Sequence, residues 1–364
     1  MSDPLGTAGL RAAALAAWTA HPPRLREDAN AEEDHARGHY RDRVVVELAQ
    51  NAADAAVRSG RPGRLLLRLT GGPRPVLLAA NTGAPLDAAG LASLASLRAS
   101  AKRDGAAAGH GSTVGRFGVG FAAVRSVADE VAVLSGGAAV HFSLARTAAL
   151  LAGEPSLAAE LARRAGSLPS LRLPFEGPGA AAPDALTEPW DTAVVLQLRD
   201  TEAVAQVRAQ LEAVDDALLL ALPGLQGVRL DLDGTVRDLA DVADRWVIVS
   251  ATGELGADLL ATRPVEERER PGWRVTWAVP RAPGATSAAA SVGVVHAPTP
   301  TDEACTVPAL LVATFPLDPS RRHVAPGPVT DMLVGHAGAA WATLLLACRG
   351  ERAEGRSAPD PLDL

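Results

Sequence analysis

The sequence predicts an α+β protein, in which short strands are largely separated from helices along the chain. Two hairpin signals support this class: apolar runs at 65–69 and 76–80 flank a Gly/Pro-rich turn, and runs at 131–134 and 140–144 flank a Ser-Gly-Gly turn. Alanine-rich segments with helical spacing of apolar residues lie around them. This order favours a sandwich of one mixed sheet with helices on one face.

The first half of the chain contains most of these elements. The segment 8–20 is alanine-rich and helical, and the His-Pro-Pro sequence at 21–23 ends it, because proline lacks a backbone donor. The polar segment 24–39 has weak periodicity and is interpreted as a loop or a short helix. Further helices are expected at 42–58, within 87–103, at 119–128 and near 156–165. A strand is expected at 192–198. The segment 104–111 is expected to be flexible, and 174–189 to be a Pro/Gly-rich loop.

A length of 364 residues suits two domains. We expect a first domain at 1–205 and a second at 206–350. The second domain is predicted to contain a helix at 202–221, strands at 227–232, 245–250, 273–279, 291–296 and 308–315, and a helix at 330–348. The polar, proline-rich segment 351–364 is predicted to be a flexible tail, and the chain is interpreted as the front part of a longer protein.

Composition excludes several classes of function. A net charge of −7 disfavours nucleic-acid binding as the main activity, which needs a basic surface. No apolar run reaches the ~18 residues of a membrane span, and no export signal precedes the first helix. The two cysteines form no disulfide framework. We therefore expect a cytoplasmic protein without a membrane partner.

A glycine run is the most informative local feature. Gly115, Gly118 and Gly120 alternate with larger residues and lead into a helical pattern; Phe117, Val119 and Phe121 complete the run. Backbone N–H groups of such a turn can face an anion, and the dipole of the following helix favours negative charge. The run predicts a phosphate site.

Three polar residues share one side of the predicted helix at 42–58. Glu47, Asn51 and Asp54 are spaced i, i+4 and i+7. An asparagine oxygen can bind Mg²⁺ beside a triphosphate, and a glutamate one turn earlier can activate water. An ordinary polar helix face is the competing interpretation.

Three further positions could contact a nucleotide. Asn81 can both donate to and accept from an adenine edge, and Gly83 permits a tight turn near a planar base. Thr192 starts a strand and offers a hydroxyl, while Lys102, the single lysine, could contact phosphate. Taken alone, Asn81 and Gly83 are better explained as a strand-ending turn and Lys102 as a solvated lysine, and nothing local distinguishes Thr192 from a strand-start threonine.

In this order the motifs resemble the GHKL (Bergerat-fold) ATPases. The segment 47–55 matches the N-box of that superfamily, 115–121 matches its second glycine box, and 97–100 resembles the start of the lid of the ninety-kilodalton heat-shock chaperones. The resemblance implies a two-layer α/β sandwich that binds ATP and Mg²⁺. It further implies that Glu47 activates water, that Asn51 binds magnesium, and that a lid spans about 98–121.

The first glycine box departs from that pattern, since Asn81-Thr-Gly83-Ala-Pro85 stands where the superfamily has Asp-x-Gly-x-Gly. This variant resembles the sacsin-type, chaperone-like ATPases of bacteria, and it puts adenine selectivity in doubt. The second half resembles the middle, transducer-like α/β domain of those proteins. By that resemblance Arg321 or Arg322 would reach the γ-phosphate; a pair of surface arginines is the competing interpretation.

The function expected from the sequence is an ATP-driven, chaperone-like switch that hydrolyses slowly, with client or partner proteins and a homodimer as its expected partners. The alternative is a catalytically silent nucleotide-binding or protein-interaction module. A sensor kinase is disfavoured because no phospho-acceptor histidine precedes the fold, and a DNA-repair ATPase is disfavoured by the acidic balance.

Overall fold

The structure is a computed structural model, and it describes residues 3–37, 41–96, 120–179, 190–263, 268, 271–282, 293–318 and 322–360. The described chain falls into two compact units. The first contains the residues up to Ala213 together with Arg229–Arg237; the second contains Val214–Val228 and the residues from Asp238 onward. The chain combines helices with sheets, as the α+β class predicts, and each unit is described by itself.

The helices of the first unit include a long N-terminal pair. They are α1 (Thr7–Ala20), α2 (Pro22–Arg37), η1 (Arg41–Arg43), α3 (Val44–Ser59), α4 (Ala88–Leu94), η3 (Gly120–Ser126), α5 (Leu144–Ala152), η4 (Pro155–Leu157), α6 (Ala158–Arg164), η5 (Ser170–Arg172) and α7 (Thr201–Glu212). The helices expected at 8–20 and 42–58 are confirmed. The segment 24–39 was wrongly expected to be a loop or a short helix, because the helix α2 covers most of it.

Eight strands form one sheet in the order β5-β4-β3-β6-β2-β1-β7-β8. Their bounds are β1 (Gly63–Thr70), β2 (Val76–Asn81), β3 (Ala128–Ser135), β4 (Ala138–Ser143), β5 (Phe175–Glu176), β6 (Thr192–Leu198), β7 (Leu225–Leu232) and β8 (Thr235–Ala240). Both predicted hairpins are confirmed as antiparallel pairs, β1–β2 and β3–β4. The strand β6 pairs antiparallel with both β2 and β3, which places the ends of three strands together.

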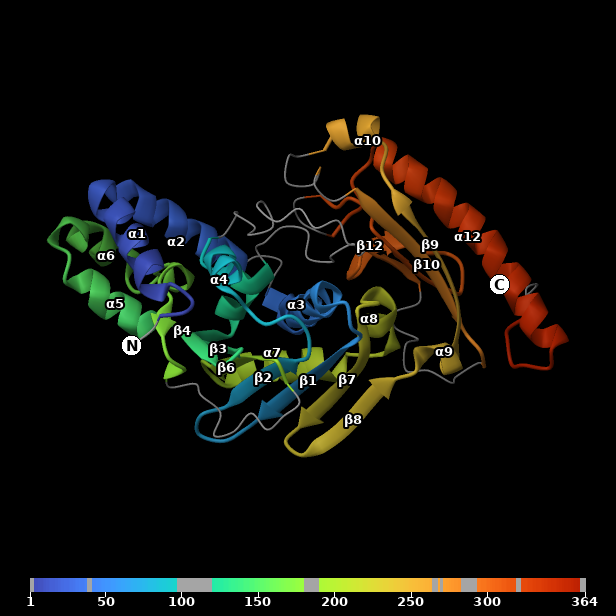
Figure 1. Cartoon of the computed structure of the whole chain (residues 1–364), viewed down its shortest axis with the longest axis horizontal. Coiled ribbons are helices and arrows are strands. Elements are labelled where there is room, and N and C mark those ends of the chain that lie inside the picture. The colour runs from blue at the N-terminus through green and yellow to red at the C-terminus, as the bar shows by residue number, and fades with distance from the viewer. Residues whose placement is uncertain are drawn as a thin grey trace. The chain divides into compact units, whose positions relative to one another are not determined.

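Helix α3 lies across this sheet and contacts β1 and β2 (Figure 1). Its apolar stripe is fully buried: Val44, Val45, Leu48, Ala52 and Ala56 are at most 4% exposed. At about 25 cal/mol per Å² of apolar surface, this burial is the main force that holds α3 on the sheet.

The second unit is built on a five-stranded sheet in the order β12-β11-β13-β10-β9. Its elements are α8 (Asp216–Ala221), α9 (Val242–Arg245), β9 (Trp246–Glu254), α10 (Ala257–Ala261), β10 (Gly272–Pro280), β11 (Val294–His296), β12 (Pro300–Ala304), β13 (Leu310–Ala313) and α12 (Pro328–Ala353). The helix expected at 202–221 is two helices, α7 and α8, because Asp215 caps a new helix by accepting a hydrogen bond from the Ala217 N–H.

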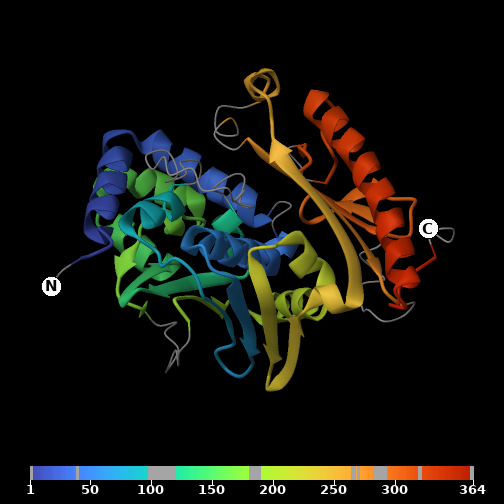
Figure 2. The same ribbon diagram turned by 45° about the vertical axis from the view of Figure 1, so that its right-hand side comes forward.

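Helix α12 packs along β9 and β10, and Figure 2 shows it beside those strands. Its buried positions are Val329, Leu333, Ala337, Ala340, Leu344 and Cys348. By length and composition it is the one helix among the described residues that could cross a membrane, although one or two such helices are weak evidence of a span. The spacing of its buried residues is instead that of a helix with one face on a sheet.

Candidate functional site

The polar residues of α3 differ in their exposure. Glu47 and Asp54 are each only 5% exposed, whereas Asn51, between them on the helix, is exposed to solvent. The buried carboxylate of Glu47 lies against the first described residue of the glycine run. A Cβ atom built on Gly120 would lie 1.9 Å from Glu47 Oε2, so a side chain at position 120 requires the Glu47 carboxylate to move. The structure therefore brings the predicted base and the end of the predicted phosphate turn into contact.

The turn after β2 is held directly on the backbone of α3. Gly83 has φ +146°, and a Cβ atom there would lie 2.6 Å from the carbonyl carbon of Ala55. The backbone N–H of Ala84 donates to the carbonyl oxygen of Ala55 at 2.9 Å. The Gly83 N–H donates to Asp191 Oδ2 at 2.8 Å. A side chain at position 83 is excluded both by its conformation and by the close approach of the helix.

Asn81 and Thr192 are direct neighbours across the β2–β6 pair. The Nδ2 atom of Asn81 donates to the carbonyl oxygen of Thr82 at 3.2 Å. The hydroxyl of Thr192 lies 2.6 Å from the hydroxyl of Ser135. Ser135 in turn accepts a hydrogen bond from the Leu86 N–H at 2.8 Å. These strand ends and the turn after β2 therefore form one hydrogen-bonded floor beside α3.

Sequence reasoning missed two members of this floor. Asp191 fixes Gly83, and Ser135 joins Leu86 to Thr192. The Trp-Asp-Thr sequence at 190–192 indicates only a role for its threonine, because Asp191 meets Gly83 across 108 positions of sequence. Ser135 was interpreted as a hairpin residue, and nothing in its local sequence marks the longer-range contact.

Most of the predicted lid lies outside the described residues. This holds for Lys102, Gly115, Phe117, Gly118 and Val119; Gly120 and Phe121 are described. The helix expected at 119–128 is a 3₁₀ helix, η3, which ends at Ser126 and is followed by β3. The ring of Phe121 is 5% exposed and lies 5.9 Å from that of Phe142, so it packs in the core.

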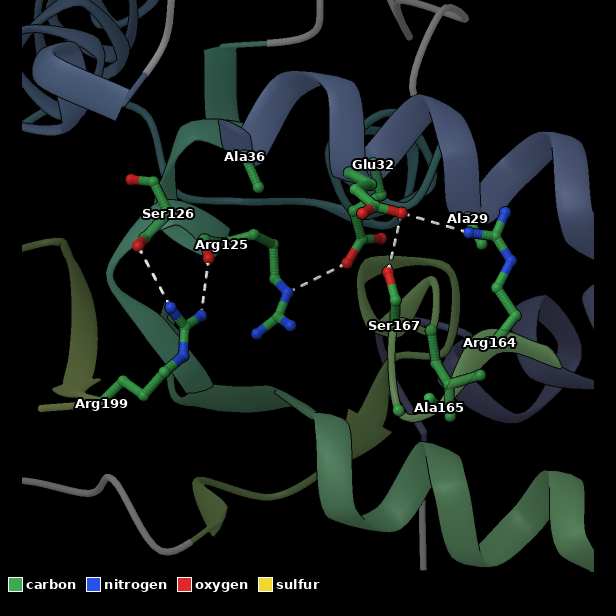
Figure 3. Close-up of a pocket in the computed structure, with 12 residues that line it drawn as sticks. Ala29, Glu32, Ala36, Arg125, Ser126, Arg164, Ala165, Ser167 and Arg199 are labelled. Atoms are coloured by element: carbon green, nitrogen blue, oxygen red, sulfur yellow. Dashed lines mark hydrogen bonds and ion pairs between the residues drawn. The ribbon is translucent and has the colours of Figure 1, made fainter. Parts of the chain in front are cut away.

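A pocket of about 760 Å³ lies beside η3, lined by residues of α2, η3, the turn after α6 and Arg199 (Figure 3). Figure 3 shows Glu32 and Arg125 pointing toward each other across it, at 3.1 Å between Arg125 Nε and Glu32 Oε1. Arg125 also donates to Asp129 at 2.9 Å. Arg199 donates to Asp129 through two nitrogens at 2.9 Å and to the Arg125 carbonyl oxygen at 2.8 Å.

The charged groups of this pocket are engaged with one another rather than open to a ligand. Arg164 donates to Glu33 at 3.2 Å and to the carbonyl oxygen of Arg26 at 2.8 Å, and Glu32 also accepts from Ser170 and Leu171. The pairs join α2 to η3, whose first residues, Gly120 and Phe121, end the glycine run. The pocket is thus a structural network that fixes one end of that run.

Burial and pairing shift two carboxyl groups of this network in opposite directions. Burial raises the pKa of Glu32, and the charge of Arg125 and the Leu171 N–H oppose this rise. Burial would also raise the pKa of Asp129, but the hydrogen bonds and charges of Arg199 and Arg125 together bring it below its ordinary value.

Arg322 belongs to the second unit and is about half exposed. Its Nε donates to Asp302 Oδ2 at 2.8 Å and its Nη2 to Oδ1 at 3.3 Å. Arg321 lies outside the described residues. The guanidinium of Arg322 is therefore engaged in a surface ion pair in this structure.

Among the described residues, no group of three or more His, Cys, Asp or Glu side chains is arranged to hold a metal ion.

Comparison with known proteins finds no match, either to a protein-family model or to a curated protein. The function must therefore be argued from the geometry of the first unit.

Proposed function

We propose that this chain is an ATP-binding switch with a Bergerat-type nucleotide site, followed by a middle, transducer-like domain, and that Glu47 serves slow ATP hydrolysis. One observation carries the proposal. Two glycines from distant parts of the sequence, Gly83 and Gly120, both lie against α3: a Cβ atom would meet the helix backbone at Gly83 and the carboxylate of Glu47 at Gly120. Close backbone approach of this kind is what a site for a planar base and a polyphosphate requires.

The adenine base of the nucleotide would lie on the floor formed by β2, β6 and the turn after β2. The Oδ1 atom of Asn81 has no hydrogen bond within the described residues and can accept from an adenine amino group. An asparagine oxygen is a weaker acceptor than the carboxylate of the resembled family. Asp191 accepts a hydrogen bond from the Gly83 N–H through Oδ2, so we assign it a role in positioning the turn after β2.

The phosphates would lie beside Asn51 and the glycine run. Asn51 is a solvent-facing polar residue of α3, and its amide oxygen suits a magnesium ion that keeps most of its waters. Bound magnesium would neutralise charge on the phosphate oxygens. The residues fit such an ion because one neutral protein ligand adds no charge to a tetra-anionic nucleotide.

Glu47 would accept the proton of the attacking water. As the water oxygen bonds to the γ-phosphorus, the bond from that phosphorus to the β–γ bridging oxygen breaks and ADP leaves. A positioned base contributes roughly 10²–10⁴-fold to such a rate. Glu47 is 5% exposed and its Oε2 lies against Gly120, so we propose that Gly120 moves before water reaches that oxygen. We propose that this contact between Gly120 and Glu47 makes hydrolysis slow and dependent on the position of the lid. A chaperone-type switch that acts on client proteins would behave in this way.

The same contact favours a second candidate, a nucleotide-binding module that does not hydrolyse. In the described arrangement Glu47 is 5% exposed. If Gly120 stays in this position, the protein would bind ATP without hydrolysing it. Isothermal titration calorimetry with Mg-ATP, with phosphate release measured on the same samples, separates the two. Binding with slow release supports the switch, binding without release supports the silent module, and no binding contradicts both.

A further inference from the structure

Helix α12 carries an exposed face on which the residues between Asp331 and Arg349, about five turns, lack charge. The exposed positions between those two charged residues are Val334, Gly335, Gly338, Ala339, Ala342, Thr343 and Leu346. Val334 and Leu346 are 57% and 68% exposed, and they are two of the three exposed large hydrophobic residues in the described chain. The residues 332–348 contain no Asp, Glu, Lys or Arg. A surface helix of this composition is expected to be covered.

The two ends of this face carry opposite charges. Asp331 and Arg349 are eighteen positions apart, so at about 3.6 residues per turn they lie on one line along the helix. Within the described part of the chain, neither side chain makes an ion pair or hydrogen bond. The uncharged face is therefore bounded by an acidic residue at one end and a basic residue at the other.

We propose that a second copy of this chain covers the face, through antiparallel packing of α12 on α12 about a twofold axis level with Ala340. That arrangement pairs Asp331 of each copy with the partner's Arg349, twice. It also sets Leu346 opposite the partner's Val334, and Gly338 opposite the partner's Ala342. A twofold interface must be complementary to itself, and the opposite charges at the two ends of this face meet that condition.

The small residues favour a helix partner over a lipid one. Glycine and alanine at 335, 338, 339 and 342 let two helix backbones approach to about 8 Å. Insertion into a membrane would instead require α12 to leave the sheet, since its opposite face contributes Leu333, Leu344 and Cys348 to the core at 0% exposure. The proposal concerns the second unit and does not depend on nucleotide binding.

One helix pair lies at or below the low end of stable interfaces, about 1,200 Å² in total, so we expect a weak dimer. Sedimentation velocity of the full chain should show reversible dimerisation between roughly 1 and 100 µM, the range that a micromolar dissociation constant requires. Asp331→Arg alone and Arg349→Asp alone should each weaken the dimer about tenfold or more, because they place like charges together. The two substitutions combined should restore it.

Ala342→Arg, which puts a charged side chain near the twofold axis, should abolish the dimer. Glu212→Arg, an exposed change on α7 in the other unit, is the matched control and should leave it intact. Thermal unfolding of every variant checks that the fold is kept. A chain that stays monomeric throughout the range overturns the proposal, as do single charge reversals without effect. Binding to phosphatidylcholine vesicles without self-association overturns it in favour of a lipid surface.

Discussion

Gly120 and Glu47 are in such close contact that a methyl group on Gly120 would lie 1.9 Å from the glutamate Oε2. The two residues are 73 positions apart, and one ends the glycine run while the other lies on the first turn of α3. The contact joins the proposed phosphate turn to the proposed base. A shift of Gly120 is therefore expected to change the position of the Glu47 carboxylate.

We expect Gly120→Ala to displace Glu47 and to lower phosphate release by about 10²-fold or more, the contribution of a positioned base. Nucleotide affinity should change much less, because the general base Glu47 does not contribute to the binding of ATP in the ground state. Steady-state phosphate release and calorimetry on one preparation measure both. Gly9→Ala is the control, since a Cβ at Gly9 meets nothing within 4 Å. Equal turnover in the Gly120 variant and the wild type would show that the contact has no catalytic consequence.

Gly83→Ala should destabilise the first unit by roughly 1–3 kcal/mol or more, because a side chain there is strained at φ +146° and meets the backbone of α3. Urea unfolding followed by circular dichroism gives the free energy of unfolding. Gly256→Ala is a suitable comparison, since Gly256 has φ −63° and open space around its Cβ. An unchanged midpoint for Gly83→Ala would mean that the turn does not pack on α3 as described.

Arg125→Met should destabilise the protein by about 3–5 kcal/mol near neutral pH, because it leaves Glu32 charged and buried without its partner. The loss should be smaller at acidic pH. Burial already raises the pKa of Glu32, and removal of the cation raises it further, so the folded variant takes up a proton as the pH falls. Denaturant unfolding over a pH series measures the trend. A loss that is constant with pH would contradict the assignment of the buried charge.

Asp129→Asn should show the opposite trend. Its pKa is lowered in the folded state, so its carboxylate contributes stability above the ordinary value of 3.8, and that contribution is lost as the pH falls toward the lower folded value. Allowing for solvent screening, we expect a deficit of about 1 kcal/mol at neutral pH. The deficit should shrink below about pH 4. Asp34→Asn, at an exposed position of α2, should show no such trend, and a similar trend there would undo the argument.

Asn51→Ala should weaken nucleotide binding in the presence of Mg²⁺ while leaving stability close to that of the wild type, because the side chain is exposed. The test is calorimetry with ATP in magnesium and, separately, in excess chelator. The magnesium-dependent part of the affinity should disappear. Unchanged affinity in magnesium would remove Asn51 from the site.

Much of the fold could be predicted from local pattern, and its failures have physical causes. The hairpins β1–β2 and β3–β4 follow from alternating apolar runs around glycine turns. Helix α2 was missed because its buried stripe, Leu25, Ala29 and Glu32, includes a carboxylate that looks exposed in sequence. The strand β8 was missed because three of its six residues are exposed and only Leu239 is buried. In both cases tertiary partners, not local preference, decide the structure.

The candidate site was predictable where residue type and spacing carry the chemistry, as with Glu47 and Asn51. Asp191 and Ser135 could not be found, since their roles depend on partners 108 and 49–57 positions away. The environment of Arg322 was equally hidden, because its partner Asp302 comes from a separate strand. The sequence pattern shows which groups are present, while the sheet order decides which of them meet.

The most direct test of the proposed hydrolytic site compares the wild type with Glu47→Ala and Glu47→Gln, measuring Mg-ATP binding by calorimetry and phosphate release on the same samples. We predict binding by all three proteins and phosphate release by the wild type alone, with the variants reduced by about 10²-fold or more. Release that persists in both variants, or a wild-type chain that does not bind ATP, would contradict the account.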